Sequence, residues 1–142
     1  MKSLWPSSFD EQNSQTPQEI LEQQAKFLPK ITEDMVVAVL EEVEEDFFDK
    51  MIEGLKGDFF YQFLLKSKFL PNYHFRVMTF SHEITIYPIY IRFEDEIKKE
   101  LALQARTLVI NNEEEFIQLI EKLFNSERMK KVIGAMIKLA KS

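Results

Sequence analysis

The chain contains no cysteine among its 142 residues. Without cysteine there is no disulfide framework, no thiolate metal site and no cysteine nucleophile. Residues 1–6 also lack the apolar run that a secretory signal requires. These absences predict a cytoplasmic protein in a reducing compartment.

Long hydrophobic runs are missing as well. The longest uninterrupted apolar stretch, residues 35–40, is far shorter than the roughly 20 residues of a membrane-spanning helix. We therefore expect no membrane-spanning helix and no membrane partner. At 45% hydrophobic and 13% aromatic residues, the chain still has enough apolar material for one continuous core.

Motifs of catalysis and cofactor binding do not occur either. Gly54 and Gly57 flank Leu55 and Lys56, but a phosphate-binding loop needs more glycines and a lysine followed by serine or threonine. There is no nucleophile elbow, no HExxH and no Ser/His/Asp spacing. The acidic residues 94–96 are explained by the preference of carboxylates for a helix start. We predict no catalytic residue, no metal site and no cofactor.

Acidic and basic residues are segregated along the chain. The net charge is −6, and residues 33–49 hold eight carboxylates and no basic residue. This balance argues against direct nucleic-acid binding. A solvated strand end or a mimic of nucleic-acid phosphates would also explain the run. Our prediction is a contact with a basic surface of another protein, made by Glu41, Glu42, Glu44, Glu45 and Asp46.

The first half of the chain predicts an arm, a helix and a strand. Residues 1–15 are polar and predict a flexible N-terminal arm, which leaves 16–142 as a single domain. Thr16, Pro17 and Glu19 form a capping box that starts a helix, and Pro29 is expected to end it. Residues 35–40 predict a strand that runs into the acidic stretch. Residues 47–56 are compatible with a helix or with a continued strand.

The second half predicts an antiparallel meander followed by helices. Apolar residues alternate with period two over 59–69, 73–78 and 84–93, with a turn at 70–72 and a tight reversal at Ser81 and His82. Pro88 places its strand at an edge or a bulge. Residues 94–105 predict a helix, 107–110 a short strand, and Asn112 and Ser126 the caps of two last helices. The fold class is therefore α+β: an antiparallel sheet of about four to five strands, helices mainly on one face, and a C-terminal helical pair.

A reversal at residues 81–82 would bring several polar side chains onto one face of the sheet. Such a face could bind an anionic or aromatic ligand or transfer a proton. It is also what a solvated face of an antiparallel sheet looks like. The candidate ligand-binding residues are Tyr61, His74, Arg76, Tyr87 and Tyr90.

The leading functional hypothesis is a non-enzymatic protein–protein interaction module, such as a small accessory, adaptor or immunity-type protein. Trp5 is a candidate anchor for the partner, or a cover for an edge of the domain. The apolar face of the last helix, with Met129 and Met136, is expected to pack into the core, and docking into a partner is the alternative. The other two hypotheses are a small-ligand-binding protein or enzyme with a pocket on the sheet face, and an acidic nucleic-acid-mimicking inhibitor.

Overall fold

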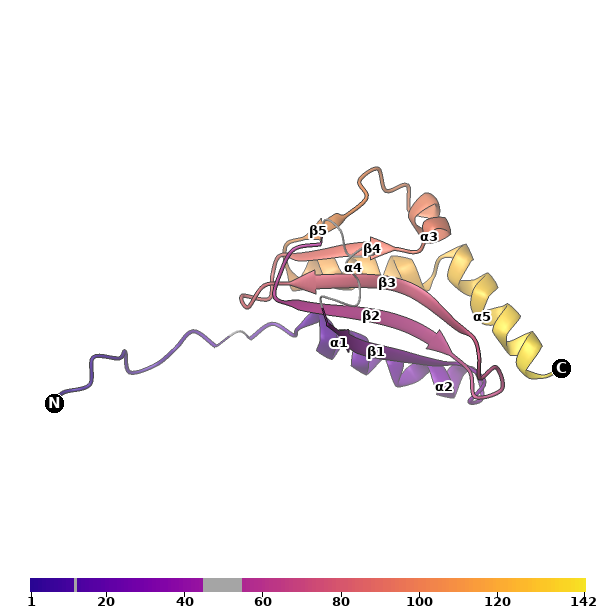
Figure 1. Cartoon of the computed structure of the whole chain (residues 1–142), viewed down its shortest axis with the longest axis horizontal. Coiled ribbons are helices and arrows are strands. Elements are labelled where there is room, and N and C mark those ends of the chain that lie inside the picture. Colours follow the sequence, from indigo (N-terminus) through magenta and orange to yellow (C-terminus); the bar gives the residue numbers. More distant parts are fainter. Residues whose placement is uncertain (12, 45–54) are drawn as a thin grey trace.

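The computed structural model describes residues 1–11, 13–44 and 55–142. It is an α+β fold with a five-stranded antiparallel sheet in the order β1-β2-β3-β4-β5 (Figure 1). The strands are β1 (Val37–Val43), β2 (Phe59–Lys66), β3 (His74–His82), β4 (Ile89–Phe93) and β5 (Leu108–Ile110). The helices are α1 (Pro17–Ala25), α2 (Phe27–Ile31), α3 (Asp95–Glu100), α4 (Glu113–Phe124) and α5 (Glu127–Ala140). The predicted fold class is confirmed, including the C-terminal helical pair.

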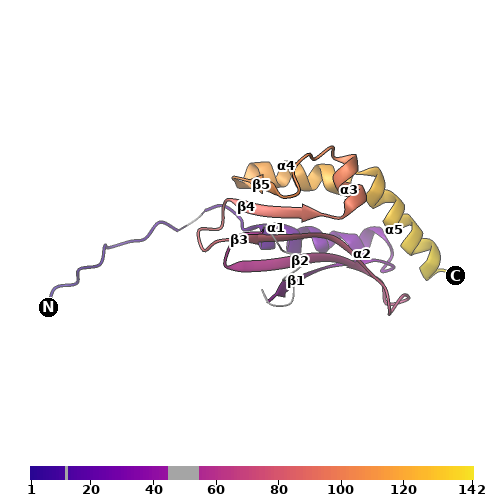
Figure 2. The same ribbon diagram turned by 45° about the horizontal axis from the view of Figure 1, so that its top comes forward.

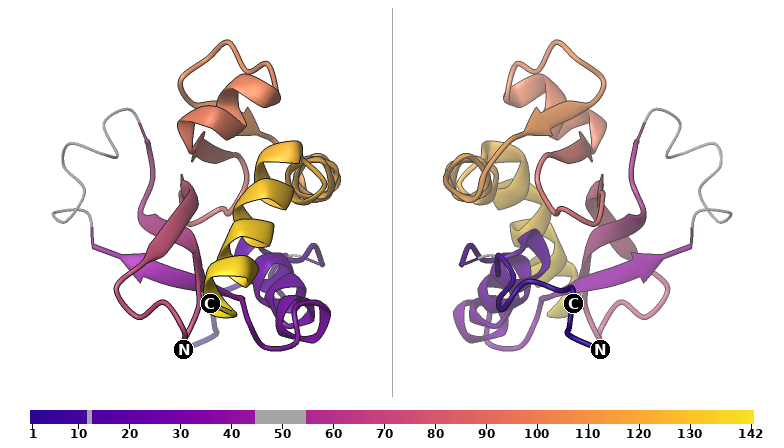
Figure 3. Two further views of the ribbon diagram at one scale, coloured as in Figure 1. Left: turned by 90° about the vertical axis from the view of Figure 1, so that its right-hand side faces the viewer. Right: turned by 90° about the vertical axis from the view of Figure 1, so that its left-hand side faces the viewer.

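Helices cover one face of the sheet. Figures 2 and 3 show α1, α2, α4 and α5 on the same side, with α3 beyond the end of β4. The core lies between these helices and the sheet, and most of its side chains are almost completely buried. Its large members include Phe63, Phe80, Phe116, Leu21, Met78, Ile91 and Leu123. The opposite face of the sheet, here called the open face, carries no described helix.

The capping signals in the sequence give the helix starts correctly. The Oγ1 of Thr16 accepts a hydrogen bond from the backbone N–H of Glu19 at 3.1 Å, as the capping box predicts. The side chains of Asn112 and Ser126 cap α4 and α5 in the same way. The prediction that Pro29 ends the first helix is wrong. Pro29 lies in the first turn of α2, where a backbone N–H would have no helical acceptor.

The predicted reversal at Ser81 and His82 is also wrong. Strand β3 continues through both residues, and His82 pairs with Ile89 at the start of β4. Residues 83–88 form the connection, which includes a cis peptide bond before Pro88. Pro88 thus precedes a central strand and marks neither an edge nor a bulge within it. Ser81 and His82 are both buried. Their hydrogen bonds are satisfied by Gln18 and Lys56, which are distant in the sequence, and by the adjacent Glu83.

A bulge in β3 sets which side chains share a face. Phe63 of β2 pairs with Met78, whereas the next residue, Leu64, pairs with Arg76, so Val77 is the extra residue. Val77 and Met78 are both buried in the core. As a result, Arg76 lies on the open face, opposite to Met78, although simple alternation would place the two together.

The ends of other segments also differ from expectation. Helix α3 stops at Glu100, earlier than the predicted 105, and Ala102 follows with a φ of 55°. Residues 1–11 extend away from the sheet and helices (Figure 1). The backbone of Gln15 is held by hydrogen bonds from the hydroxyl of Tyr87 and to the carboxylate of Glu113, each 3.2 Å long. The flexibility of the 1–15 arm stays a prediction. The predicted helix or strand at 47–56 lies mostly outside the described residues.

Candidate functional site

The acidic residues predicted to bind a partner fall at the end of β1. Glu41 lies on the open face, where its carboxylate accepts hydrogen bonds from Lys66 at 3.0 Å and from Gln62 at 2.7 Å. These bonds, that of Lys66 first, hold the pKa of Glu41 below its usual value. Glu42 and Glu44 are exposed. The predicted Glu45 and Asp46 are outside the described residues.

The five predicted ligand-binding residues are divided between the two faces of the sheet. Tyr61 and Tyr87 pack against the core on the helical side. Burial there raises the pKa of Tyr87 to about 12. His74, Arg76 and Tyr90 belong to the open face, at register positions shared with Lys66, Leu64 and Ser81. The structure therefore does not bring the five side chains together.

Tyr61 instead belongs to a partly buried polar cluster beneath α1. The Nε2 of Gln18 donates to the hydroxyl oxygen of Tyr61 at 2.7 Å and lies 2.9 Å from Nε2 of His82. The Nδ1 of His82 lies 2.6 Å from the carbonyl oxygen of Glu83 and donates to it, which leaves Nε2 to accept from Gln18. The rings of Tyr61 and His82 are stacked. This cluster ties α1 to β2 and β3, so it positions the helical layer.

A pocket that the sequence analysis missed lies at one end of the open face. Its volume is about 400 Å³, and four cationic side chains line it. We call it the cationic pocket, and these side chains are Arg76, Arg92, Lys98 and Arg106. They come from β3, β4, α3 and the segment before β5, so no local sequence pattern groups them.

An apolar hollow lies on the helical side, between α2 and α5. It has a volume of about 500 Å³, and we call it the apolar groove. Ala38 of β1 and Phe63 and Leu65 of β2 form its floor. The α1–α2 segment forms one wall with Gln24, Ala25, Phe27, Leu28, Ile31 and Thr32, and the other wall comes from Phe124, Asn125, Met129, Lys130, Ile133, Gly134 and Ile137.

Gly134 leaves the α5 wall of the groove open. A Cβ added there would meet no heavy atom of the described residues within 4 Å. Lys130 is the only charged residue among the described ones that line the groove. The groove can thus accept an apolar segment, with one cation available at its edge.

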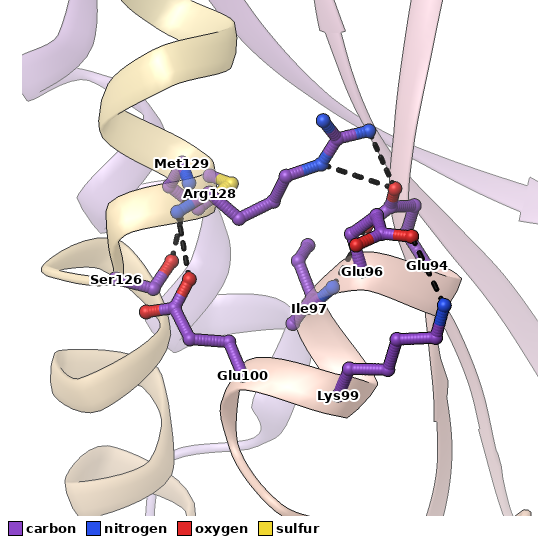
Figure 4. Close-up of polar contacts among 8 residues, drawn as sticks. All are labelled: Glu94, Glu96, Ile97, Lys99, Glu100, Ser126, Arg128 and Met129. Atoms are coloured by element: carbon purple, nitrogen blue, oxygen red, sulfur yellow. Dashed lines mark hydrogen bonds and ion pairs between the residues drawn. The ribbon is translucent and has the colours of Figure 1, made fainter.

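Polar contacts at the start of α5 fix the position of this wall (Figure 4). Glu94 Oε1 accepts hydrogen bonds from Arg128 Nη2 at 2.7 Å and from Nε at 3.1 Å, and these bonds raise the pKa of the Arg128 guanidinium. The carboxylate of Glu100 accepts a hydrogen bond from the backbone N–H of Arg128 at 2.8 Å. The Oγ of Ser126 accepts one from the N–H of Met129. Carboxylates at a helix N-terminus also complement the helix dipole. Helix α5 is therefore held in place by several independent contacts.

No protein-family model, curated protein or solved structure matches this chain. Among the described residues, no helix is long and apolar enough to cross a membrane. In the same part of the chain, no group of three or more His, Asp or Glu side chains is arranged to hold a metal ion. The site therefore has to be interpreted from its own geometry.

Proposed function

We propose that this protein is a non-enzymatic protein–protein interaction module whose apolar groove binds an amphipathic helix of a partner protein. The observation that carries the proposal is the groove between α2 and α5, which is open, apolar and about 500 Å³ in volume. An amphipathic helix that packs its apolar face into a hydrophobic groove is a recurring mode of recognition.

The walls of the groove expose apolar side chains that a closed core would bury. Phe27 is 52% exposed and Ile31 is 76% exposed, although both belong to a helix that packs beside the sheet. Across the groove, Ile133 and Ile137 are only half-buried. Contiguous apolar surface of this kind on a soluble protein marks an interaction site more often than chance exposure does. A third helix laid between α2 and α5 would bury both walls.

The charge around the groove indicates an acidic partner. Lys130, Gly134 and Lys138 are spaced four residues apart and follow one line along α5, with Lys130 in the groove lining. On the other wall, Lys30 lies over the ring of Phe27 at 5.9 Å. Carboxylates beside the apolar face of the bound helix would meet these cations and speed the encounter. The proposed partner segment is thus an amphipathic helix with acidic flanks.

A contact with a basic partner at the end of β1 remains a second hypothesis. Glu42, Glu44 and Asp58 surround a hollow of about 540 Å³. Glu41, by contrast, is already bonded by Lys66 and Gln62. If a basic partner binds here, charge reversal at Glu42 and Glu44 abolishes its capture without unfolding the domain. Trp5 is 77% exposed on the extended arm and fits the role of an added anchor.

The test of the groove uses two adjacent residues of α5. Gly134→Phe fills the groove from its own wall, whereas Ala135→Phe places the same ring on the other side of the helix, where Ala135 lines a separate hollow. The wild-type chain and both variants are used to capture proteins from the native host. A synthetic peptide of the captured protein's amphipathic helix is then titrated against each purified variant.

We expect Gly134→Phe to weaken peptide binding by about ten-fold or more, because the ring occupies the space of partner side chains. Ala135→Phe should bind the peptide like the wild type. Equal binding by wild type and Gly134→Phe, or a loss confined to Ala135→Phe, would show that the partner does not use the groove. Far-UV circular dichroism of both variants verifies that they are folded.

A further inference from the structure

Strand β1 forms one border of the sheet and pairs with β2 on its inner side alone (Figure 2). Natural edge strands are commonly protected from further pairing by lysine, proline, other charged side chains or a bulge. The register between β1 and β2 is continuous, and β1 contains neither lysine nor proline. Its charged residues are Glu41 and Glu42, near its end. Residues 37–40 are all apolar, so this half of the edge has none of these protections.

The direction of the backbone groups of β1 follows from the contacts of Val36, directly before the strand. The N–H of Val36 donates to Oγ1 of Thr32 at 3.1 Å, and its carbonyl oxygen lies 3.1 Å from the same atom. Thr32 follows α2, so Val36 points its backbone groups away from β2. Because this direction alternates along an antiparallel strand, Ala38, Leu40 and Glu42 also point theirs outward. In the described part of the chain, the backbone of these three residues forms no hydrogen bond outside the pairing with β2.

These outward backbone groups are arranged symmetrically about Leu40. A second copy of β1, related by a twofold axis at Leu40, would place Ala38 of one copy opposite Glu42 of the other and Leu40 opposite Leu40. In each of these pairs the two residues would exchange both backbone hydrogen bonds. Thr32 already occupies the backbone of Val36, and β1 ends at Val43. The pairing would therefore use the whole free part of the edge, as an interface between identical surfaces requires.

The charges of β1 favour the same register. Glu41 would lie opposite Val39 of the other copy, and Glu42 opposite Ala38, so no two carboxylates would face each other directly. An axis at Glu41 would instead place the two Glu41 side chains opposite one another. The pairing would also bury apolar side chains that are half-buried in one copy, namely Val37, Val39, Leu40 and Val43.

We propose that the protein forms a symmetric homodimer through the edge of β1, in which two sheets join across antiparallel β1 strands. The interface is limited to one strand of each copy, so we expect a dissociation constant in the micromolar range. A twofold axis perpendicular to the sheet keeps the helices of both copies on one side. Both apolar grooves would open on that side, and a partner with two helices would bind with increased avidity. This last consequence rests on the proposed function, whereas the dimer itself does not.

The first test is sedimentation velocity of the full chain, which should show a monomer–dimer equilibrium at concentrations up to about 100 µM. Val39→Glu places a carboxylate opposite Glu41 of the other copy, whereas Val39→Lys places an ammonium there. Val39→Glu should therefore dimerise about ten-fold more weakly than Val39→Lys. The variants are matched, because each puts a charge at the same half-buried position. A monomer at every concentration, or equal dimerisation of the two variants, would overturn the proposal.

The second test is disulfide formation, since the wild-type chain has no cysteine. In Leu40→Cys the two cysteines would face each other at a Cα separation of about 5.5 Å, which a disulfide can span. In Glu42→Cys they would be about 13 Å apart along the paired strands. We expect mild oxidation to crosslink Leu40→Cys and to leave Glu42→Cys uncrosslinked, with circular dichroism verifying that both are folded. Equal crosslinking of the two, or crosslinking of Glu42→Cys alone, would overturn the proposal.

The dimer and the groove can be tested separately. Peptide binding is measured on the weakly dimerising Val39→Glu variant, whose changed residue does not line the groove. Loss of peptide binding in Gly134→Phe with no dimer in the wild type would leave the proposed function intact and overturn the dimer.

Discussion

Gly134 offers a direct test of whether the groove is open in the folded protein. The residue lies in the middle of the 14-residue helix α5, where glycine is unfavourable because it loses more backbone entropy than alanine on folding. A Cβ at this position meets no heavy atom within 4 Å among the described residues, so the methyl group of alanine would clash with no neighbour there. Gly134→Ala should therefore stabilise the protein by about 0.5–1 kcal/mol, the difference in helix propensity alone.

The increase in the free energy of unfolding of Gly134→Ala can be measured by urea unfolding followed by circular dichroism. The urea concentration at the midpoint of unfolding should rise, while the dependence of the unfolding free energy on urea stays unchanged. The melting temperature should rise by about 3 °C. Gly57→Ala is the contrasting variant, because Gly57 has a φ of 136° and its added Cβ would clash with the carbonyl oxygen of His82. That substitution should destabilise by about 1–3 kcal/mol or more. A neutral or destabilising Gly134→Ala would refute the reasoning, since it would mean that the space beside Gly134 is filled.

Two further predictions concern the support of the fold. Glu94→Ala removes both the N-cap of α3 and the ion-pair partner of Arg128, so it should lower the free energy of unfolding in urea by about 1–2 kcal/mol. The control is Glu96→Ala on the exposed face of α3, which should change that free energy by less than about 0.5 kcal/mol. Equal changes in the unfolding free energy of the two variants would show that the contacts of Glu94 do not stabilise the fold. Burial raises the pKa of Tyr87 to about 12 from 10.0, so its neutral phenol contributes stability that is fully present below pH 10 and is lost as the pH rises towards 12. Phenolate absorbance should show one tyrosine that titrates late and is absent in Tyr87→Phe, and a uniform titration of all tyrosines near pH 10 would contradict this.

The fold was largely predictable because its signals are local. Thr16, Asn112 and Ser126 are helix caps with hydrogen-bonding side chains, and a cap acts on the three residues that follow it. The alternation of apolar residues likewise depends only on neighbours. The failure at Ser81 and His82 has the opposite origin. Their polar groups are satisfied by Gln18, Lys56 and Glu83, and two of these partners are distant in the sequence.

Neither candidate site could be derived from the sequence, because each depends on tertiary register. The bulge at Val77 moves Arg76 to the open face, where it lines a pocket with Arg92. In α5 the apolar residues form one broad stripe that serves two purposes. Met136 is buried in the core as the sequence analysis expected, whereas Ile133 is half-buried and lines the groove. Spacing alone cannot separate a core position from a groove position on the same stripe.

The most direct test of helix docking is site-specific crosslinking from α5. The chain has no native cysteine, so Gly134→Cys and Ala135→Cys each carry a single photoreactive label. We predict that the label at position 134 crosslinks to the acidic amphipathic helix of the partner protein and that the label at 135 does not. Crosslinks from position 135 alone, or to a partner segment that is not an amphipathic helix, would contradict the central claim.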